Sequence, residues 1–253
     1  MNGCILQQVS KRFEVDGRSV QALRDISLSV PRGSFVSIVG YSGCGKSTLL
    51  KTIIGLLPAD EGSVRFVGLE GRSAIVFQEP RLIASRNVEK NIRLALKHEK
   101  NPETREKIID DVLHMLGLEP FRKAYPWQLS GGMAQRAALG RALCRQPELL
   151  LMDEPFGALD ALTRARLQDE LIQIYLNRDI TVLFVTHDVA EAVFLGNRVL
   201  VMQEGEIIDD VPVPLPYPRS RISSDLLSVQ RKVLASMAQS GHPLRKEIHI
   251  HEE

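Results

Sequence analysis

Gly40-Tyr41-Ser42-Gly43-Cys44-Gly45-Lys46-Ser47 matches the phosphate-loop pattern Gly-x-x-x-x-Gly-Lys-Ser/Thr. The motif stands between an apolar, β-branched run at Phe35–Val39 and a helical pattern that opens at Lys46, which is the context it requires. Its glycines allow successive backbone N–H groups to point at phosphate oxygens, and the positive end of the helix dipole adds to the attraction. A chance glycine-rich turn is the alternative, and the motif and its context together argue against it.

The motif predicts how ATP is bound. Lys46 is expected to reach the β- and γ-phosphates, and Ser47 is expected to ligate a magnesium ion. The predicted nucleotide-binding residues of this stretch are Gly40, Tyr41, Ser42, Gly43, Cys44, Gly45, Lys46, Ser47 and Thr48. Cys44 is interpreted as a small space-filling residue, although a thiol at this place could also be oxidised and block the nucleotide.

A second signal is the run Leu149-Leu150-Leu151-Met152, which ends in Asp153 and Glu154. A buried parallel strand presents the residues at its carboxyl end to a ligand. Asp153 suits magnesium binding, and Glu154 suits a general base that orients and deprotonates the attacking water. Without the phosphate loop, the run would indicate only a strand followed by a solvated turn.

A third signal is Leu129-Ser130-Gly131-Gly132, which opens a helix. A serine cap and two glycines at a helix start form another end where an anion can bind. Taken alone, this stretch indicates only a well-capped helix.

Strand and helix patterns alternate along the chain and predict an α/β fold of the P-loop NTPase class. We expect a mainly parallel sheet core, an inserted helical lobe and an antiparallel β portion near the N-terminus. The predicted strands are Phe35–Val39, Ser73–Phe77, Leu149–Met152, Thr181–Thr186 and Arg198–Gln203. The predicted helices are Lys46–Gly55, Glu103–Leu116, Ala134–Cys144 and Leu162–Leu176.

Two domains are predicted. The ATPase domain covers residues 1–211, with its core in 1–78 and 146–211 and its helical lobe in 79–145. Residues 212–253 should form a proline-rich linker, a helix from about Ser224 to Ala238 and a polar tail. His249 and His251 in that tail are too few for a strong metal site.

The composition of the chain limits the kinds of partner that it can bind. Of 253 residues, 44% are hydrophobic, and 32 Lys and Arg against 31 Asp and Glu leave a net charge of +1. No field strong enough to gather nucleic acid is present, so we expect no nucleic-acid partner. Three widely spaced cysteines indicate a reducing compartment, and no apolar run approaches the ~20 residues that a membrane helix needs. Any membrane role is therefore expected to run through a separate protein.

Together these motifs resemble the nucleotide-binding subunit of an ABC transporter, over nearly all of Val9 to Ile208. The Leu-Ser-Gly-Gly segment is the most specific part, because most other phosphate-loop proteins lack it. The resemblance implies an adenine-stacking ring at Phe13, a magnesium- and water-sensing side chain at Gln78, contact between subunits at Asp160, and γ-phosphate contact at His187. The catalytic residues expected are thus Lys46, Gln78, Glu154 and His187, the magnesium ligands are Ser47, Gln78 and Asp153, and the partner copy's ATP is contacted by Ser130, Gly131, Gly132 and Asp160.

The resemblance also implies an assembly. Two copies should sandwich ATP, and a membrane permease should dock near Gln78 to Leu82, at the cytoplasmic face of a bacterial inner membrane. A finer likeness, in Gln78-Glu79-Pro80-Arg81-Leu82 and the stretch from Asp153 to Arg164, is to importers for nitrate, sulfonates and taurine, which work with an extracytoplasmic solute-binding protein. The chain departs from that pattern at Ala84-Ser85-Arg86 and at Ala134. Alternatives are an importer of another solute class, an exporter, a soluble ABC ATPase switch, and a regulator without turnover.

Overall fold

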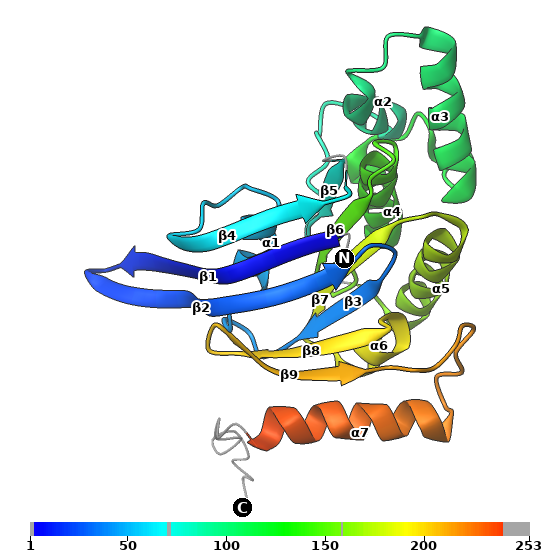
Figure 1. Ribbon diagram of the computed structural model, residues 1–253. Helices are drawn as coiled ribbons and strands as arrows, with labels where there is room; N and C mark the ends of the chain where they lie inside the picture. The colour runs from blue at the N-terminus through cyan, green and yellow to red at the C-terminus, as the bar shows by residue number, and fades with distance from the viewer. Residues whose placement is uncertain (1–2, 70–71, 158, 240–253) are drawn as a thin grey trace, which may run out of the picture.

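The computed structural model describes residues 3–69, 72–157 and 159–239 (Figure 1). In chain order its elements are β1 (Gly3–Val15), β2 (Arg18–Pro31), β3 (Phe35–Val39), α1 (Lys46–Ile53), β4 (Glu61–Val67), β5 (Ser73–Val76), α2 (Val88–Arg93), α3 (Pro102–Met115), α4 (Gly131–Leu143), β6 (Leu149–Asp153), α5 (Ala161–Asn177), β7 (Thr181–Thr186), α6 (Val189–Leu195), β8 (Arg198–Gln203), β9 (Glu206–Pro212) and α7 (Ser224–Gln239). Within these ranges, none of the helices has the length and apolar character needed to cross a membrane.

The core is a six-stranded sheet in the order β5-β6-β7-β3-β8-β9. The strands from β5 to β8 pair in parallel, and β9 pairs antiparallel with β8. Every residue of β3, β6 and β7 is buried, which is typical of a sheet covered on both faces. The predicted α/β fold with a mainly parallel sheet is confirmed.

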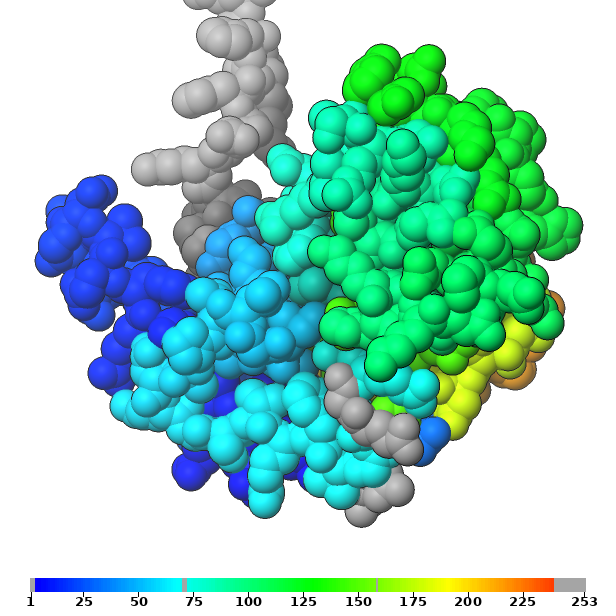
Figure 2. Space-filling view, turned by 90° about the horizontal axis from the view of Figure 1, so that it is seen from above, coloured from blue at the N-terminus to red at the C-terminus, as the bar shows by residue number. Residues whose placement is uncertain are grey.

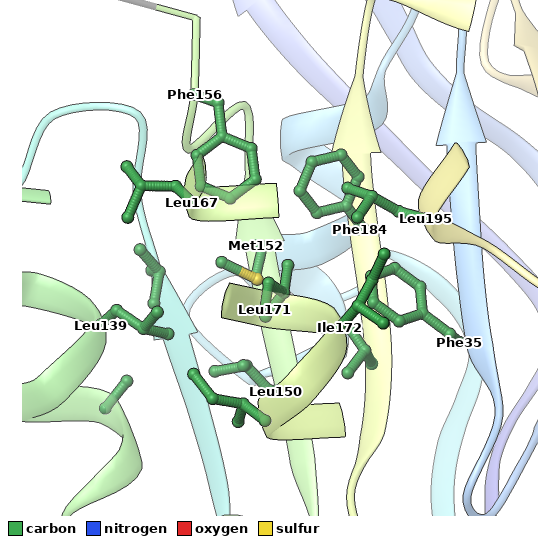
Figure 3. Close-up of a cluster of buried hydrophobic side chains, with 14 of the residues drawn as sticks. Phe35, Leu139, Leu150, Met152, Phe156, Leu167, Leu171, Ile172, Phe184 and Leu195 are labelled. Atoms are coloured by element: carbon green, nitrogen blue, oxygen red, sulfur yellow. The ribbon is translucent and has the colours of Figure 1, made fainter. Parts of the chain in front are cut away.

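Successive residues of these strands point to opposite faces, and each face has its own apolar cluster. One face carries Phe35, Met152 and Phe184, against which α5 packs Leu167 and Leu171 (Figure 3). The rings of Phe35 and Phe184 lie with centroids 6.1 Å apart. The opposite face is covered by α1 and the N-terminal strands. Burial on both faces explains why the sequence shows these strands as continuous apolar runs rather than as alternating patterns.

A second sheet, in the order β2-β1-β4, is antiparallel and contains the first two long strands. This confirms the antiparallel portion near the N-terminus. The pairing of β1 with β2 is interrupted by register shifts between Leu6 and Arg12, and polar residues fill the exposed positions. These interruptions break the alternation on which a strand assignment from sequence depends.

Between β5 and β6, the structure describes helices and turns but no strand. Figure 2 shows this segment, in green, as a mass on one side of the molecule, beside the blue and cyan N-terminal strands. Its core combines side chains of α2, α3 and α4, including Ile92, Ile109 and Leu139. The division into a core and a lobe at residues 79–145 stays a prediction.

Strand β9 extends to Pro212, and the predicted division of the chain at residues 211 and 212 stays a prediction. Helix α7 follows and buries Leu226, Val229 and Val233 in the main apolar cluster. Leu227 and Leu234, which share the same helix, are exposed. The helix therefore packs on its own chain. The remainder of the predicted tail, with His249 and His251, lies outside the described residues.

Candidate functional site

One group of the predicted site residues lies at the carboxyl ends of four neighbouring parallel strands. Strand β5 leads to Gln78, β6 to Asp153 and Glu154, β7 to His187, and β3 to the phosphate loop. Parallel strands end at the same edge of a sheet, and that edge is where α/β proteins bind ligands. The order β5-β6-β7-β3 thus brings together groups that are up to 147 residues apart in the chain.

The phosphate loop needs glycine for two different reasons. Gly43 and Gly45 have φ of 80° and 107°, a backbone region that side chains with a Cβ rarely adopt. Gly40 has no positive φ, but a Cβ there would lie 2.2 Å from the carbonyl oxygen of Met202. Helix α1 begins after Gly45 without a side-chain cap, so the donors of its first turn remain available to an anion. The loop therefore suits phosphate oxygens.

Lys46 supplies a buried positive charge in this loop. Its side chain is 4% exposed, and Nζ donates to the carbonyl oxygens of Gly40 at 2.7 Å and Tyr41 at 2.9 Å. The Oε1 atom of Glu154 lies 3.9 Å from Nζ. The charge is thus held by backbone dipoles in the fold of the loop itself.

Cys44 belongs to the same loop, and its side chain is buried. Burial raises the pKa of its thiol, while the nearby Lys46 opposes the shift. Because thiolates are the reactive form, this environment supports a space-filling role rather than redox chemistry.

Ser47 and Asp153 form a pair at the start of α1 and the end of β6. Ser47 Oγ donates to Asp153 Oδ1 at 2.7 Å. Asp153 is 7% exposed, and burial raises the pKa of its carboxyl, although the hydrogen bond from Ser47 opposes the change. In the described part of the chain, no group of three or more His, Cys, Asp or Glu side chains could hold a metal alone. A hydroxyl and one carboxylate beside a phosphate loop instead fit Mg²⁺, which usually takes its other ligands from phosphates and water.

Glu154 follows Asp153 in a strained backbone conformation. Its φ is 44°, in the left-handed region, and its N–H donates to the carbonyl oxygen of Val185 at 2.9 Å. Its Oε2 atom lies 2.8 Å from His187 Nδ1. The carboxylate thus contacts a histidine on one oxygen and lies near Lys46 on the other, as a positioned base requires.

Gln78 is exposed just beyond β5. A Cβ built on Gly157 would lie 3.6 Å from Gln78 Nε2, so this amide lies against the turn that follows Glu154. Gln78 thus lies beside the turn after Glu154. Among the hydrogen bonds of the described residues, none joins Gln78 to Ser47 or Asp153, which bond to each other.

Two residues that hold the Gln78 segment were not predicted. Gln135 Nε2 donates to the carbonyl oxygen of Phe77 at 3.2 Å, and Arg141 donates to Pro80 and Arg81 carbonyls at 3.0 and 2.8 Å. Both side chains come from α4. Polar residues interrupting an otherwise apolar helical pattern were the available signal.

The Ser130 group forms a second cluster. Ser130 is the N-cap of α4, and its hydroxyl accepts from Met133 N at 3.3 Å. A Cβ on Gly132 would lie 2.6 Å from Thr163 Cγ2, so the start of α4 packs against α5. Asp160 caps α5 by accepting from Leu162 N and Thr163 N at 3.1 and 3.0 Å. These capping hydrogen bonds lower the pKa of the Asp160 carboxyl.

Phe13 lies near the end of β1, paired with Val20 of β2. It is half-buried, and Lys11 Nζ lies 5.7 Å from its ring centroid. The same ammonium pairs with Asp60 at 2.6 Å. The ring is therefore partly open to stack on a flat ligand.

The comparisons with known proteins agree with this geometry. A model of the ABC transporter family matches residues 23–157. The aliphatic sulfonates import ATP-binding protein SsuB of Bacillus subtilis strain 168 is 42% identical over 240 residues, which cover 91% of this chain and 92% of that protein. The protein of the same name from Rhodopseudomonas palustris is 45% identical, over 87% of this chain and 79% of its own length.

Solved structures show the same fold. The ATP-binding cassette MJ0796, in a dimeric post-hydrolysis state bound to ADP and Pi, superposes with a TM-score of 0.77 at 31% identity. The match covers 84% of this chain and all of that one. With a family model over more than half of the chain and relatives above 40% identity over most of it, the chain belongs to the ABC transporter family, as an ATP-binding subunit that hydrolyses ATP.

Proposed function

We propose that this chain energises the import of a small solute, an aliphatic sulfonate or a related compound such as taurine or nitrate, through a separate membrane permease. The observation that carries the ATPase part is the convergence of Lys46, the Ser47–Asp153 pair and the Glu154–His187 pair at one sheet edge. The relatives named for aliphatic sulfonate import support the solute class.

Binding of ATP follows from the loop. The backbone N–H groups of Gly40 to Thr48 and the Lys46 ammonium hold the phosphates, and the ring of Phe13 stacks on adenine. Lys46 exchanges its carbonyl partners for phosphate oxygens. Ser47 and Asp153 would hold Mg²⁺, with Gln78 completing the set. When bound, that ion neutralises charge on the β- and γ-phosphate oxygens.

Hydrolysis is assigned to Glu154 and His187. Glu154 accepts a proton from the attacking water and orients it in line with the γ-phosphorus. His187 holds the Glu154 carboxylate through Nδ1 and presents its other ring nitrogen to the γ-phosphate. Because His187 is mostly exposed, that nitrogen can reach a ligand.

Two copies complete each site. Ser130, Gly131 and Gly132 would contact the ATP held by the partner copy, with Asp160 beside the contact. Gly131 is exposed at the N-terminus of a 13-residue helix, whose free N–H groups attract phosphate. The dimeric form of the MJ0796 cassette supports this arrangement.

Closure of the dimer is passed to the permease by the helical lobe, residues 79–145, through the segment Gln78 to Leu82. Gln135 and Arg141 fasten this segment to α4 and so link nucleotide state to the lobe. The chain would thus lie peripherally at the cytoplasmic face of a bacterial inner membrane, with a solute-binding protein acting on the other side.

The first test is Glu154→Gln in the purified protein. We expect kcat for ATP to fall at least about 100-fold, because a general base contributes roughly 10²–10⁴-fold. Binding of ATP should persist, so that the variant accumulates as an ATP-dependent dimer on a sizing column and as a monomer with ADP. Lys232→Ala, on the exposed side of α7, serves as the control with unchanged turnover.

Retention of wild-type turnover in Glu154→Gln would remove this residue from the mechanism. The permease is tested separately, by tagging the chain in its native cell and extracting membranes gently. Recovery of a multi-spanning permease supports import, whereas recovery of only soluble partners would replace it with a soluble ATPase switch.

A further inference from the structure

The segment after β9 makes a loop at the end of that strand and leads to the start of α7 on the same side of the molecule (Figure 1). Arg219 fastens its middle. The Arg219 guanidinium donates to the carbonyl oxygens of Val193, Phe194 and Gly196 at 2.9, 3.0 and 2.7 Å, and lies over the Tyr217 ring at 4.2 Å. These carbonyls close the C-terminal end of α6, so Arg219 acts as its cap.

Arg221, two residues later, contacts a different place. Its guanidinium lies 3.8 Å from the centroid of Phe194 in α6. Its Nη2 donates to three oxygens of α5: Asp169 Oδ1 at 2.9 Å, Gln168 Oε1 at 3.1 Å and the Ala165 carbonyl at 3.1 Å. One side chain thus holds α5 and α6 together.

Gln168 extends this contact into the interior. Its Nε2 donates to Glu191 Oε1 at 2.9 Å, and both residues are only 6% exposed. The amide therefore has one orientation that satisfies both partners, with oxygen toward Arg221 and nitrogen toward the carboxyl. Burial raises the pKa of Glu191, while hydrogen bonds from Thr186 and Gln168 oppose the shift.

Glu191 in turn reaches the two residues beside His187. The Thr186 side chain is close enough to the Glu191 carboxyl to oppose the rise of its pKa, and Thr186 Oγ1 accepts from Asp188 N at 3.0 Å. Asp188 Oδ1 accepts from Glu191 N at 3.1 Å, and Asp188 Oδ2 lies 3.7 Å from Arg164. The backbone on both sides of His187 is thereby fixed by a hydrogen-bonded chain that ends at Arg221.

We infer that Arg221, Gln168 and Glu191 are positioning residues for His187. The C-terminal segment, which carries Arg221, therefore contributes to the geometry of the ATPase site. The network orients the imidazole so that Nδ1 meets Glu154 Oε2 at 2.8 Å. A cavity of about 230 Å³ lies beside it, lined in part by Arg164, Gln168, Glu191 and Arg221. Loss of the Arg221 side chain widens this solvent-open pocket toward Gln168, so that water competes for the Gln168 and Glu191 hydrogen bonds.

The inference rests on the proposed role of His187, and the experiment separates the two. Steady-state ATP hydrolysis and nucleotide binding are measured for Arg221→Gln, His187→Ala and the double variant. We expect Arg221→Gln to lower kcat about tenfold while KM and ATP affinity stay within twofold, since residues in one network couple by this order. In the His187→Ala background, Arg221→Gln should change kcat by less than twofold.

Three further variants distinguish loss of this network from a general loosening of the segment. Arg221→Lys should recover part of kcat because one donor remains. Glu191→Gln should lower kcat like Arg221→Gln, because the amide offers Gln168 Nε2 one acceptor oxygen in place of two and so weakens the same network. Arg219→Gln is the matched control, since it loosens the same segment at α6 without touching Gln168. It should lower the melting temperature while leaving kcat within twofold.

The inference is overturned by unchanged kcat in Arg221→Gln, or by effects of Arg221→Gln and His187→Ala that multiply in the double variant. An equal loss of kcat in Arg219→Gln would likewise assign the effect to loosening of the segment. If His187→Ala itself retained full kcat, the proposed site would fail instead.

Discussion

Gly131 and Gly132 are neighbours at the start of α4, yet their surroundings differ. A Cβ on Gly132 would lie 2.6 Å from Thr163 Cγ2, closer than any ordinary carbon contact. On Gly131 it would lie 3.7 Å from Leu159 Cδ2, which is normal van der Waals distance. Packing between α4 and α5 thus requires glycine at position 132 but not at position 131.

This difference predicts unequal effects on stability. Gly132→Ala should lower the free energy of unfolding by about 1–2 kcal/mol, the usual cost of overpacking. Gly131→Ala should be neutral or slightly stabilising, because alanine favours helix. Urea unfolding of both proteins measures the difference.

Thr163→Ser supplies the control, because it removes the Cγ2 methyl and keeps the hydroxyl. The double variant Gly132→Ala, Thr163→Ser should regain most of the lost stability. If it did not, contact with Thr163 would not be the reason for glycine at position 132.

The site residues show how far a residue-level prediction extends. The phosphate loop and Asp153-Glu154 were identifiable because each is a contiguous run with a known context. The 2.8 Å contact of Glu154 with His187 could not be identified from the sequence, since it depends on β6 lying beside β7. The Arg221 network was also unpredictable, because Arg219 and Arg221 follow a proline-rich stretch and show no periodic pattern.

At the scale of elements, the helical segment is held by a charged cluster around Glu89 of α2. Glu89 accepts from Arg122 Nε at 2.8 Å and Lys123 Nζ at 2.9 Å, and also pairs with Arg93. Its side chain is 10% exposed. Burial alone would raise the pKa of Glu89, but the hydrogen bonds from these cations outweigh it and lower the pKa to about 2.

The lowered pKa predicts an acid-dependent loss of stability. Because the folded-state pKa lies below the unfolded value of 4.5, the stabilisation is present above pH 4.5 and is lost as pH falls toward 2. At pH 7, Glu89→Gln should lower the free energy of unfolding by about 2 kcal/mol, less than for a fully buried pair, since Lys123 is exposed to solvent.

Denaturant unfolding from pH 7 to pH 3 measures both proteins. The gap between wild type and Glu89→Gln should narrow below pH 4.5. A gap that stayed constant over this range would show that the pKa of Glu89 is the same in the folded and unfolded states, and would contradict the account of the cluster.

Element prediction succeeded where burial is uniform. Strands β3, β7 and β8 have the predicted bounds, because their continuous apolar runs end in glycine or polar residues. The long strands β1 and β2 could not be located by residue, since bulges and exposed polar side chains interrupt their alternation. Helices α2 and α6, of 6 and 7 residues, are too short for a helical period to emerge.

At the scale of the molecule, the helical segment, the six-stranded sheet and the C-terminal helix α7 lie in different places. Figure 1 shows the helical segment and α7 at opposite ends, with the six-stranded sheet between them. The groups to which we assign catalysis lie at one edge of that sheet. We propose that they are connected to both ends: to the helical segment through Gln135 and Arg141, and to the C-terminal segment through Gln168 and Glu191. This arrangement suits a protein that converts hydrolysis into movement of a partner.

The most direct measurement of that conversion is transport by the reconstituted complex. The chain and its co-purifying permease are placed in proteoliposomes with the solute-binding protein, and uptake of a radiolabelled aliphatic sulfonate is followed with and without ATP. We predict accumulation that requires ATP and disappears with Glu154→Gln. Uptake that proceeded equally without ATP, or with Glu154→Gln, would contradict the claim that this chain powers import.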